Sequence, residues 1–356
     1  MPRSRIGLIG PDASQPCGIA DYVERLAAAL AAECDLAFVP FREALASPRL
    51  EPCQAILVHY ERSLVPDAGF LTRLGARFPG RMFVVPHEVY AEDPFAFPYA
   101  DLRATFPPLL WLKRALYLRR HRKYARERRL QAEGYAAHGV IPLSEPNAAI
   151  LGPLAPGKIL DPVPHAFYAP SEASPPPRRE DFFPRRPRAI LGIFGFLNPA
   201  SDYAQVFDLM AGLDPGTALL ILGGDRSPGD MRARLEGEAT ARGLSERVRI
   251  TGWLAPERVG AHLSLCDLFI SPMRFKSNSG SLLHLFHLER PILVPELPLT
   301  RWLRAEGAPV DLYRDTAELR RLALGYLDGK ARPPANRYRW DFPTVARGYL
   351  RAMGVG

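Results

Sequence analysis

The feature that most constrains this fold is an alternation of short apolar runs with amphipathic stretches, repeated in both halves of the chain. Strands that alternate with helices predict a parallel sheet covered by helices on both faces. We therefore predict two doubly wound, Rossmann-like α/β domains that face a central cleft. The expected strands lie at 5–10, 35–41, 54–60, 81–87, 138–143 and 159–164, and then at 188–196, 217–224, 247–253, 267–273 and 290–296.

A proline-rich segment separates the two halves. Residues 169–188 hold six prolines, and proline fits neither a helix interior nor a central strand. We therefore predict an N-terminal domain over 1–168, a linker over 169–188 and a C-terminal domain over 189–338. Residues 339–356 hold a last helix.

The size and apolar pattern of the chain narrow its class. Its 356 residues suit two domains. No apolar run reaches the roughly 18–20 residues of a transmembrane helix, and the run after the basic start is too short for a signal peptide. We expect a cytosolic protein. The four cysteines, Cys17, Cys34, Cys53 and Cys266, lack metal-ligand spacing, so we expect no metal and mostly packing roles for them.

The positive charge is concentrated in one segment. Residues 113–129 hold nine Lys and Arg against one Glu, which accounts for the whole net charge of +8. Leucines and aromatic residues flank these cations within 106–129, as in a helix that lies on a membrane surface. The alternatives are a solvated helix with one side packed on the sheet and a helix that binds a polyanion such as nucleic acid, for which the chain lacks a motif. The candidate membrane residues are Trp111, Arg119, Arg120, Arg122 and Lys123.

Ligands of parallel sheets bind at the carboxyl ends of the strands. The loop after the first expected strand, 10–23, is not a G-x-G-x-x-G fingerprint, which disfavours a dinucleotide dehydrogenase. Its candidates are Cys17, Gly18 and Asp21. His87 ends a later strand, where it is either a cleft residue or a buried, hydrogen-bonded histidine. Glu88, His59 and Glu61 are weaker candidates in the same region.

The segment 277–281, SNSGS, is typical of a phosphate-binding loop. It is small, rich in donors, free of acids and followed by an expected apolar helix. Successive backbone N–H groups, a helix dipole and serine hydroxyls together favour an anion. An ordinary helix cap would need only one serine. Arg274 and Lys276 stand ahead of the loop and would neutralise a diphosphate.

Several segments together resemble the retaining, metal-independent GT-B glycosyltransferases of the "group 1" family. They are PCGIADYVERLAAAL, VVPHE, VIPLSE, VPHAF, FGFLNPASDY, LILGG, VRITGWL and DLFISPMRF followed by SGSLLHLFHLERPILVPE. The resemblance covers nearly the whole chain. It implies a nucleotide-sugar donor on the C-terminal domain, an acceptor on the N-terminal domain, and a last helix that crosses back to the N-terminal domain. The nucleotide-sugar is a co-substrate, and no cofactor is implied.

The resemblance also implies residue roles. His87 would contact the transferred sugar, and Gly18 would line its phosphate. The nucleobase would lie near Gly252 and Trp253. The diphosphate would lie on Ser279, Gly280 and Ser281, with Gly195 and Asn198 also contacting the donor.

Four donor contacts of the family are replaced in this sequence. The positions of its two glutamates hold Lys276 and His284, and those of its Arg/Lys pair hold Phe196 and Ser201. Arg274 and Lys276 would restore the lost positive charge.

The expected function is sugar transfer from a nucleotide-sugar to a hydroxyl of a sugar or lipid-linked acceptor, in envelope or exopolysaccharide assembly. A non-catalytic scaffold and a sugar-nucleotide epimerase are the alternatives.

Overall fold

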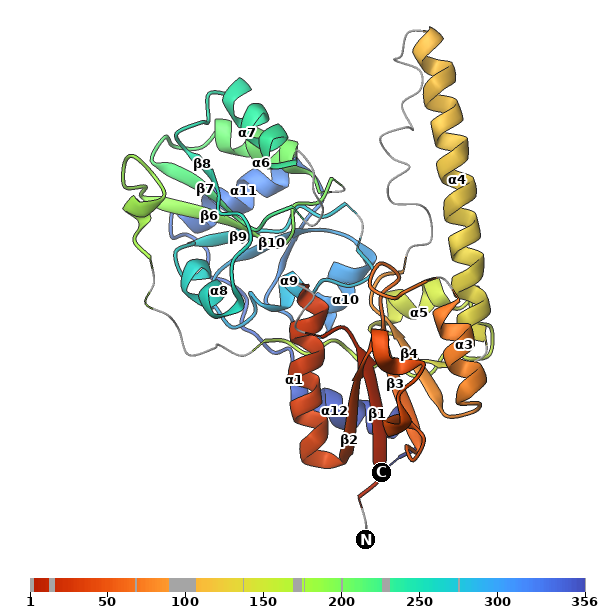
Figure 1. Ribbon diagram of the computed structural model, residues 1–356. Helices are drawn as coiled ribbons and strands as arrows, with labels where there is room; N and C mark the ends of the chain where they lie inside the picture. The colour runs from red at the N-terminus through yellow and green to blue at the C-terminus, as the bar shows by residue number, and fades with distance from the viewer. Residues whose placement is uncertain are drawn as a thin grey trace. The chain divides into compact units, whose positions relative to one another are not determined.

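The computed structural model describes residues 3–12, 17–67, 69–89, 107–136, 138–168, 175, 177–199, 201–225, 231–274 and 276–355. The chain divides into two compact units (Figure 1). Unit 1 comprises Met1–Ala166, Lys276–Asn278 and Trp340–Gly356, and unit 2 comprises Phe167–Phe275 and Ser279–Arg339. The last helix therefore belongs to the same unit as the N-terminal residues, and the described part of 169–188 belongs to unit 2.

Unit 1 is built on a five-stranded sheet in the order β2-β1-β3-β4-β5, in which every pairing is parallel. Its strands are buried on both faces because helices cover both; all six residues of β3, for example, are buried. The strands are β1 (Arg5–Gly10), β2 (Asp35–Pro40), β3 (Ala55–Tyr60), β4 (Met82–Pro86) and β5 (Gly139–Val140). The strand expected at 159–164 is reduced to one bridge between Val140 and Ile159.

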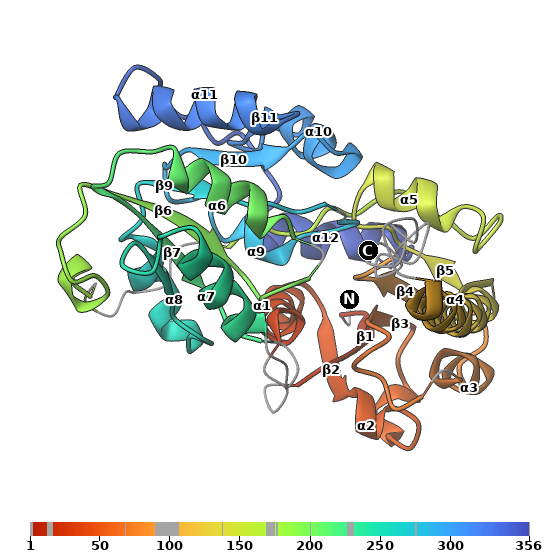
Figure 2. The ribbon, with the colours of Figure 1, turned by 90° about the horizontal axis from the view of Figure 1, so that it is seen from above.

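Helices lie on both faces of this sheet (Figure 2), and successive strand residues point to opposite faces. Ile56, Val58 and Tyr60 of β3 pack into a core shared with α2, α3, α5 and the C-terminal end of α4. Residues of the opposite parity, such as His59, face α12, which itself packs along α1. The helices are α1 (Gly18–Glu33), α2 (Phe41–Ala44), α3 (Phe70–Arg77), α4 (Pro107–Ala136), α5 (Glu145–Leu151) and α12 (Phe342–Ala352).

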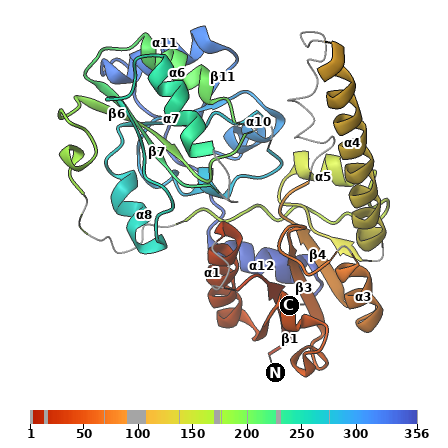
Figure 3. The same cartoon turned by 45° about the horizontal axis from the view of Figure 1, so that its top comes forward.

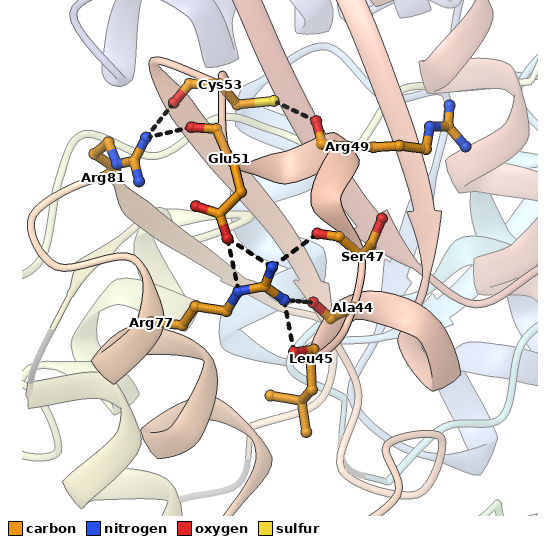
Figure 4. Close-up of polar contacts among 8 residues, drawn as sticks. All are labelled: Ala44, Leu45, Ser47, Arg49, Glu51, Cys53, Arg77 and Arg81. Atoms are coloured by element: carbon orange, nitrogen blue, oxygen red, sulfur yellow. Dashed lines mark hydrogen bonds and ion pairs between the residues drawn. The ribbon is translucent and has the colours of Figure 1, made fainter.

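Arg77 ties the segment after β2 to the end of α3 (Figure 4). Its guanidinium donates to the carbonyls of Leu45 (2.6 Å) and Ser47 (3.0 Å) and pairs with the Glu51 carboxylate (2.6 Å). These carbonyls lie in the segment that joins α2 to the short 3-10 helix η1 (Pro48–Leu50). One planar donor group therefore satisfies backbone groups that no helix or strand satisfies.

Unit 2 is a six-stranded parallel sheet in the order β11-β10-β9-β6-β7-β8 (Figure 2). Figure 3 labels β6, β7 and β11 of this sheet. The chain winds outward from β6 in both directions, so the order of strands reverses between β6 and β9. The predicted fold class, two parallel-sheet α/β domains, is therefore confirmed. The strands are β6 (Ala189–Phe194), β7 (Thr217–Leu222), β8 (Val248–Ile250), β9 (Leu268–Ile270), β10 (Ile292–Pro295) and β11 (Asp311–Tyr313). The helices are α6 (Tyr203–Ala211), α7 (Met231–Ala241), α8 (Pro256–Leu263), α9 (Gly280–Leu283), α10 (Pro298–Ala305) and α11 (Thr316–Leu327), with a 3-10 turn η4 at Arg179–Asp181.

The cysteines are free thiols. Cys34, Cys53 and Cys266 are buried, and burial raises the pKa of each thiol. Thiols in this state are packing residues and not nucleophiles at neutral pH.

Candidate functional site

In unit 1, three histidines meet behind the carboxyl ends of β3 and β4. His59 is the fifth residue of β3, and His87 follows β4, where its backbone N–H donates to the Tyr60 carbonyl (2.9 Å). Nδ1 of His59 lies 2.9 Å from Nε2 of His87, and both side chains are buried. His165 completes the group, with its ring centroid 5.9 Å from that of His87. The structure thus brings two predicted histidines into direct contact and adds a third that the sequence did not single out.

Aromatic rings from two helices enclose these histidines. Tyr22 of α1 stacks against His165, with 3.8 Å between ring centroids, and lies edge-on to His87 at 5.7 Å. Tyr349 of α12 lies edge-on to His59 at 5.3 Å. The last helix therefore supplies part of the wall behind His87.

Burial keeps the three imidazoles neutral. It lowers the pKa of His59 to about 3 and that of His165 to about 4, with the neighbouring His165 further lowering the value for His59. The pKa of His87 is also well below the usual value, first because of burial and then because His59 and His165 lie close by. At neutral pH the group therefore offers hydrogen bonds and no charge.

The first-loop candidates lie at the start of α1. Cys17 is the N-cap residue, and its Sγ accepts from the Ala20 backbone N–H (3.3 Å). Gly18 opens the helix, and a Cβ added there would meet no atom within 4 Å. Asp21 pairs with Arg25 one turn later (3.0 Å), and Glu88 is half-buried. Residues 13–16 of this loop lie outside the described part of the chain.

In unit 2, glycines let three strand-end loops pack backbone to backbone. Gly195 follows β6 with φ +126°, and a Cβ there would lie 3.1 Å from the Ser281 side chain. A Cβ on Gly223, after β7, would lie 1.8 Å from the Gly195 carbonyl oxygen, and one on Gly224 would lie 2.7 Å from the Trp253 nitrogen. Gly223 and Gly224 were not among the predicted donor-site residues, although two glycines at the end of an expected strand were a usable signal.

The predicted phosphate loop has a different setting from the one expected. The helix that follows it, α9, is only four residues long. Such a short helix has too small a dipole to stabilise a bound anion. Ser279 is buried, and its hydroxyl lies 3.4 Å from that of Ser281. Ser277 belongs to unit 1, where its Oγ accepts from the Val89 backbone N–H (3.0 Å).

The two cations near this loop are placed differently. Arg274 makes an ion pair with Asp202 (2.8 Å), which also caps the N-terminus of α6. Lys276 is half-buried and belongs to unit 1. Arg274 already has a carboxylate partner. To neutralise a bound anion, it would have to release Asp202 or contact both groups at once.

Aromatic rings line the rest of this edge of unit 2. His284 stacks on Tyr168, with 3.5 Å between centroids and 12° between planes, and lies edge-on to Phe194. Gly252 has φ +76°, and the side chain of Trp253 beside it is 54% exposed. The backbone N–H of Asn198 donates to the Tyr203 hydroxyl (3.3 Å). An exposed indole offers a flat surface on which a nucleobase can stack.

The basic segment forms most of α4. Its C-terminal end packs on α3 and β5, where Gly134 and Tyr135 are buried. Arg119 and Arg122 are exposed, as are Leu116 (44%) and Leu118 (46%). Of the other predicted membrane residues, the side chains of Trp111, Arg120 and Lys123 lie outside the described part of the structure, as does residue 106.

The described residues contain no group of three or more His, Cys, Asp or Glu side chains that could hold a metal ion. Within the same residues, no helix is both long and apolar enough to cross a membrane.

Comparison with known sequences gives a partial relative. No family model matches the chain. The GDP-mannose:glycolipid 4-beta-D-mannosyltransferase of Xanthomonas campestris pv. campestris is 29% identical over 173 residues, 45% of this chain and 48% of that protein. The chain thus matches about half the length of this curated relative.

Comparison with solved structures gives the fold. HepE of Anabaena in complex with UDP-glucose aligns with a TM-score of 0.65 and 14% identity over 98% of this chain and 99% of its own. Sucrose-phosphate synthase of Thermosynechococcus elongatus aligns at 0.60 and 15% over 99% and 95% of the two chains. WaaG, a glycosyltransferase involved in lipopolysaccharide biosynthesis, aligns at 0.58 and 16% over 97% and 95%. These likenesses show that the chain has the GT-B fold.

Proposed function

We propose that this protein is a glycosyltransferase that moves a sugar from a nucleotide-sugar to an acceptor hydroxyl. The observation that carries the proposal is the carboxyl edge of the unit 2 sheet. There, Gly195, Gly223 and Gly224 bring three loops together beside Ser281 and an exposed Trp253. The fold shared with the UDP-glucose complex of HepE and the partial likeness to a mannosyltransferase support the same function.

The proposed donor site uses backbone and hydroxyl donors instead of charged side chains. The nucleobase stacks on Trp253, and the diphosphate accepts hydrogen bonds from the Ser279 and Ser281 loop. His284, stacked on Tyr168, occupies the position where the resembled family has a glutamate. Donors fixed around the leaving diphosphate stabilise the charge that develops as the bond to the sugar breaks.

The proposed reaction retains the configuration of the sugar and uses no metal. The bond between the anomeric carbon and the diphosphate breaks, and the acceptor oxygen forms a new bond to the anomeric carbon. The acceptor proton passes to the leaving phosphate, and His87 holds the sugar through a hydrogen bond. His87 is neutral in this role because burial lowers its pKa.

A non-catalytic, sugar-binding scaffold is the second candidate. It is favoured by one observation: Arg274, which was expected to replace the family's cationic contacts, already pairs with Asp202. The two candidates differ in whether a nucleotide binds unit 2.

Calorimetric titration with UDP, GDP, ADP and dTDP tests this difference. We expect one nucleotide to bind at micromolar strength. We expect Ser279→Ala/Ser281→Ala to weaken the binding of this nucleotide at least tenfold, which corresponds to about 1.4 kcal/mol, because hydrogen bonds to the phosphates are lost. The matched control is Ser245→Ala/Ser264→Ala, whose hydroxyls lie before β8 and β9 at the other edge of the sheet. If no nucleotide binds, the scaffold function replaces the transferase.

We also propose that α4 rests on an anionic membrane surface, where a lipid-linked acceptor in envelope or exopolysaccharide assembly would be reached. This proposal is supported by the charge of residues 113–129, which hold nine cations and one acid. The exposed Leu116 and Leu118 lie between these cations. Exposed leucines fit a lipid surface better than a nucleic acid, whose phosphates attract the cations but offer no apolar surface to a leucine side chain.

A further inference from the structure

We infer that His59 is a positioning residue that holds His87 in one neutral tautomer, with the His87 proton on Nδ1. The tautomer does not depend on the proposed function. Only its use, a hydrogen bond to the transferred sugar, rests on that function. The basis of the inference is the 2.9 Å contact between Nδ1 of His59 and Nε2 of His87, deep inside unit 1. His59 is 0% exposed, and its other ring nitrogen, Nε2, has no hydrogen-bond partner among the described residues.

Two neutral arrangements can make this hydrogen bond, and they differ in what they leave buried. In the first, His59 Nδ1–H donates to the lone pair of His87 Nε2, and His59 Nε2 is a bare acceptor. In the second, His87 Nε2–H donates to His59, and His59 must carry its proton on the buried Nε2. The second arrangement buries the His59 Nε2–H without an acceptor, whereas the first leaves unbonded only the His87 Nδ1–H, an atom that is not among the fully buried ones without a partner. Buried N–H groups without a partner are rarer in native proteins than under-satisfied acceptors, so the first arrangement is favoured.

A protonated arrangement is disfavoured by the surroundings. Among the described residues, the rings that face the pair are those of Tyr22 from α1, Tyr349 from α12 and His165. None of these carries a negative charge at neutral pH. Burial and the neighbouring imidazoles lower the pKa of both His59 and His87.

The ring of His87 is also fixed in orientation. The backbone N–H of His87 is bonded to the Tyr60 carbonyl, and its ring packs edge-on to Tyr22 (72°) and His165 (88°). Because Nε2 is used by His59, Nδ1–H is the polar atom that remains for a ligand. His87 would therefore act as a hydrogen-bond donor to a substrate oxygen, such as a sugar hydroxyl, and not as a proton acceptor.

Nitrogen-15 NMR of histidine-labelled protein reads the tautomer directly. In the wild-type protein we expect one protonated Nδ1 on His87 and one on His59, with both Nε2 signals unprotonated, throughout pH 6.5 to 8. His59→Phe keeps a ring of similar size but has no donor, so His87 should then exchange between tautomers. His59→Asn places an amide N–H near the position of Nδ1 and should restore the wild-type His87 signal. A proton on Nε2 of wild-type His87, or an unchanged signal in His59→Phe, would overturn the inference.

Turnover of the nucleotide-sugar identified by titration supplies the second readout. His59→Phe should lower kcat tenfold or more with a smaller change in the KM for the donor, whereas His59→Asn should stay within about threefold of wild type. The control is His138→Phe, a buried histidine of the same unit whose ring nitrogens have no partner among the described residues. It should leave kcat unchanged. Equal loss in His59→Phe and His59→Asn would overturn the positioning role.

The two readouts separate this inference from the proposed function. If no donor turns over but the NMR signals are as expected, the transferase function fails and the tautomer assignment stands. If His59→Phe does not fold, the wild-type tautomer and the His59→Asn variant still decide the question.

Discussion

Lowering the pH from 7 to 5 should destabilise unit 1 by several kcal/mol. His59, His87 and His165 are buried and neutral, and the pKa of each is below its ordinary value of 6.5, at about 3 for His59 and about 4 for His165. Between pH 6.5 and about 4, the unfolded chain therefore binds protons that the folded chain does not. Stability that is fully present above pH 6.5 is lost as the pH falls, by about 1.4 kcal/mol per pH unit for each histidine.

These three histidines contribute a loss of about 4 kcal/mol per pH unit below pH 6.5, which is a large part of a typical stability of 5–15 kcal/mol. His138 of the same unit, whose pKa is also lowered by burial, adds to this loss. Denaturant unfolding at pH 7.5, 6.5, 5.5 and 5.0, followed by circular dichroism, measures this slope. Acidic groups with a lowered pKa, such as Asp67 and Glu318, titrate below this window. The variant His165→Phe should reduce the slope by about one proton. A stability that is flat between pH 7 and 5 would contradict neutral burial of the three imidazoles.

Removing three positive charges from α4 should weaken binding to anionic vesicles by roughly 100-fold. Arg119, Arg122 and Arg126 are exposed on this helix, and each Lys or Arg near an anionic surface contributes about 1 kcal/mol. Changing all three to Gln therefore costs about 3 kcal/mol of binding free energy. Co-sedimentation with vesicles of phosphatidylglycerol and phosphatidylcholine measures the change. Raising the salt concentration should weaken vesicle binding by the wild-type protein more than vesicle binding by the variant.

The matched control removes the same charge elsewhere. Arg232, Arg234 and Arg258 are exposed on α7 and α8 of unit 2, and their change to Gln should leave vesicle binding within about twofold of wild type. If both triple variants lose binding equally, net charge and not α4 is responsible. If neither loses binding, α4 is not the membrane surface. Tight binding to duplex DNA with none to vesicles would favour the polyanion alternative.

The architecture could be predicted from the sequence because it depends on local patterns. Alternation of apolar runs predicted the two parallel sheets, including the strand expected at 217–224, where the structure has Thr217–Leu222. The strand expected at 159–164 does not form. Ile159 makes an isolated bridge to Val140 of β5, and the bridge does not continue into a ladder. Whether an apolar run forms a strand is decided by its neighbours, which a local pattern does not contain.

The contacts of the candidate site were less predictable, since they depend on which side chains meet in space. His59 and His87 were each noted at a strand end, but their mutual hydrogen bond follows from the register between β3 and β4. The pairing of Arg274 with Asp202 spans 72 residues, and no local signal predicts it. The expected helix after the phosphate loop is a single turn, because the bonds from Leu285 N–H to the Leu282 carbonyl and from Leu288 N–H to the Leu285 carbonyl have the i→i−3 spacing of tight turns.

The proposed function is the transfer of a sugar from a nucleotide donor. The most direct measurement incubates the protein with radiolabelled GDP-mannose, UDP-glucose and related donors, with and without a bacterial membrane lipid extract, and follows label into the organic phase. We expect one donor to give labelled lipid only when the extract is present, and we expect Ser279→Ala/Ser281→Ala to lose this product while Ser245→Ala/Ser264→Ala keeps it. No transfer and no donor consumption in any combination, from a protein that is folded at pH 7.5, would contradict the claim.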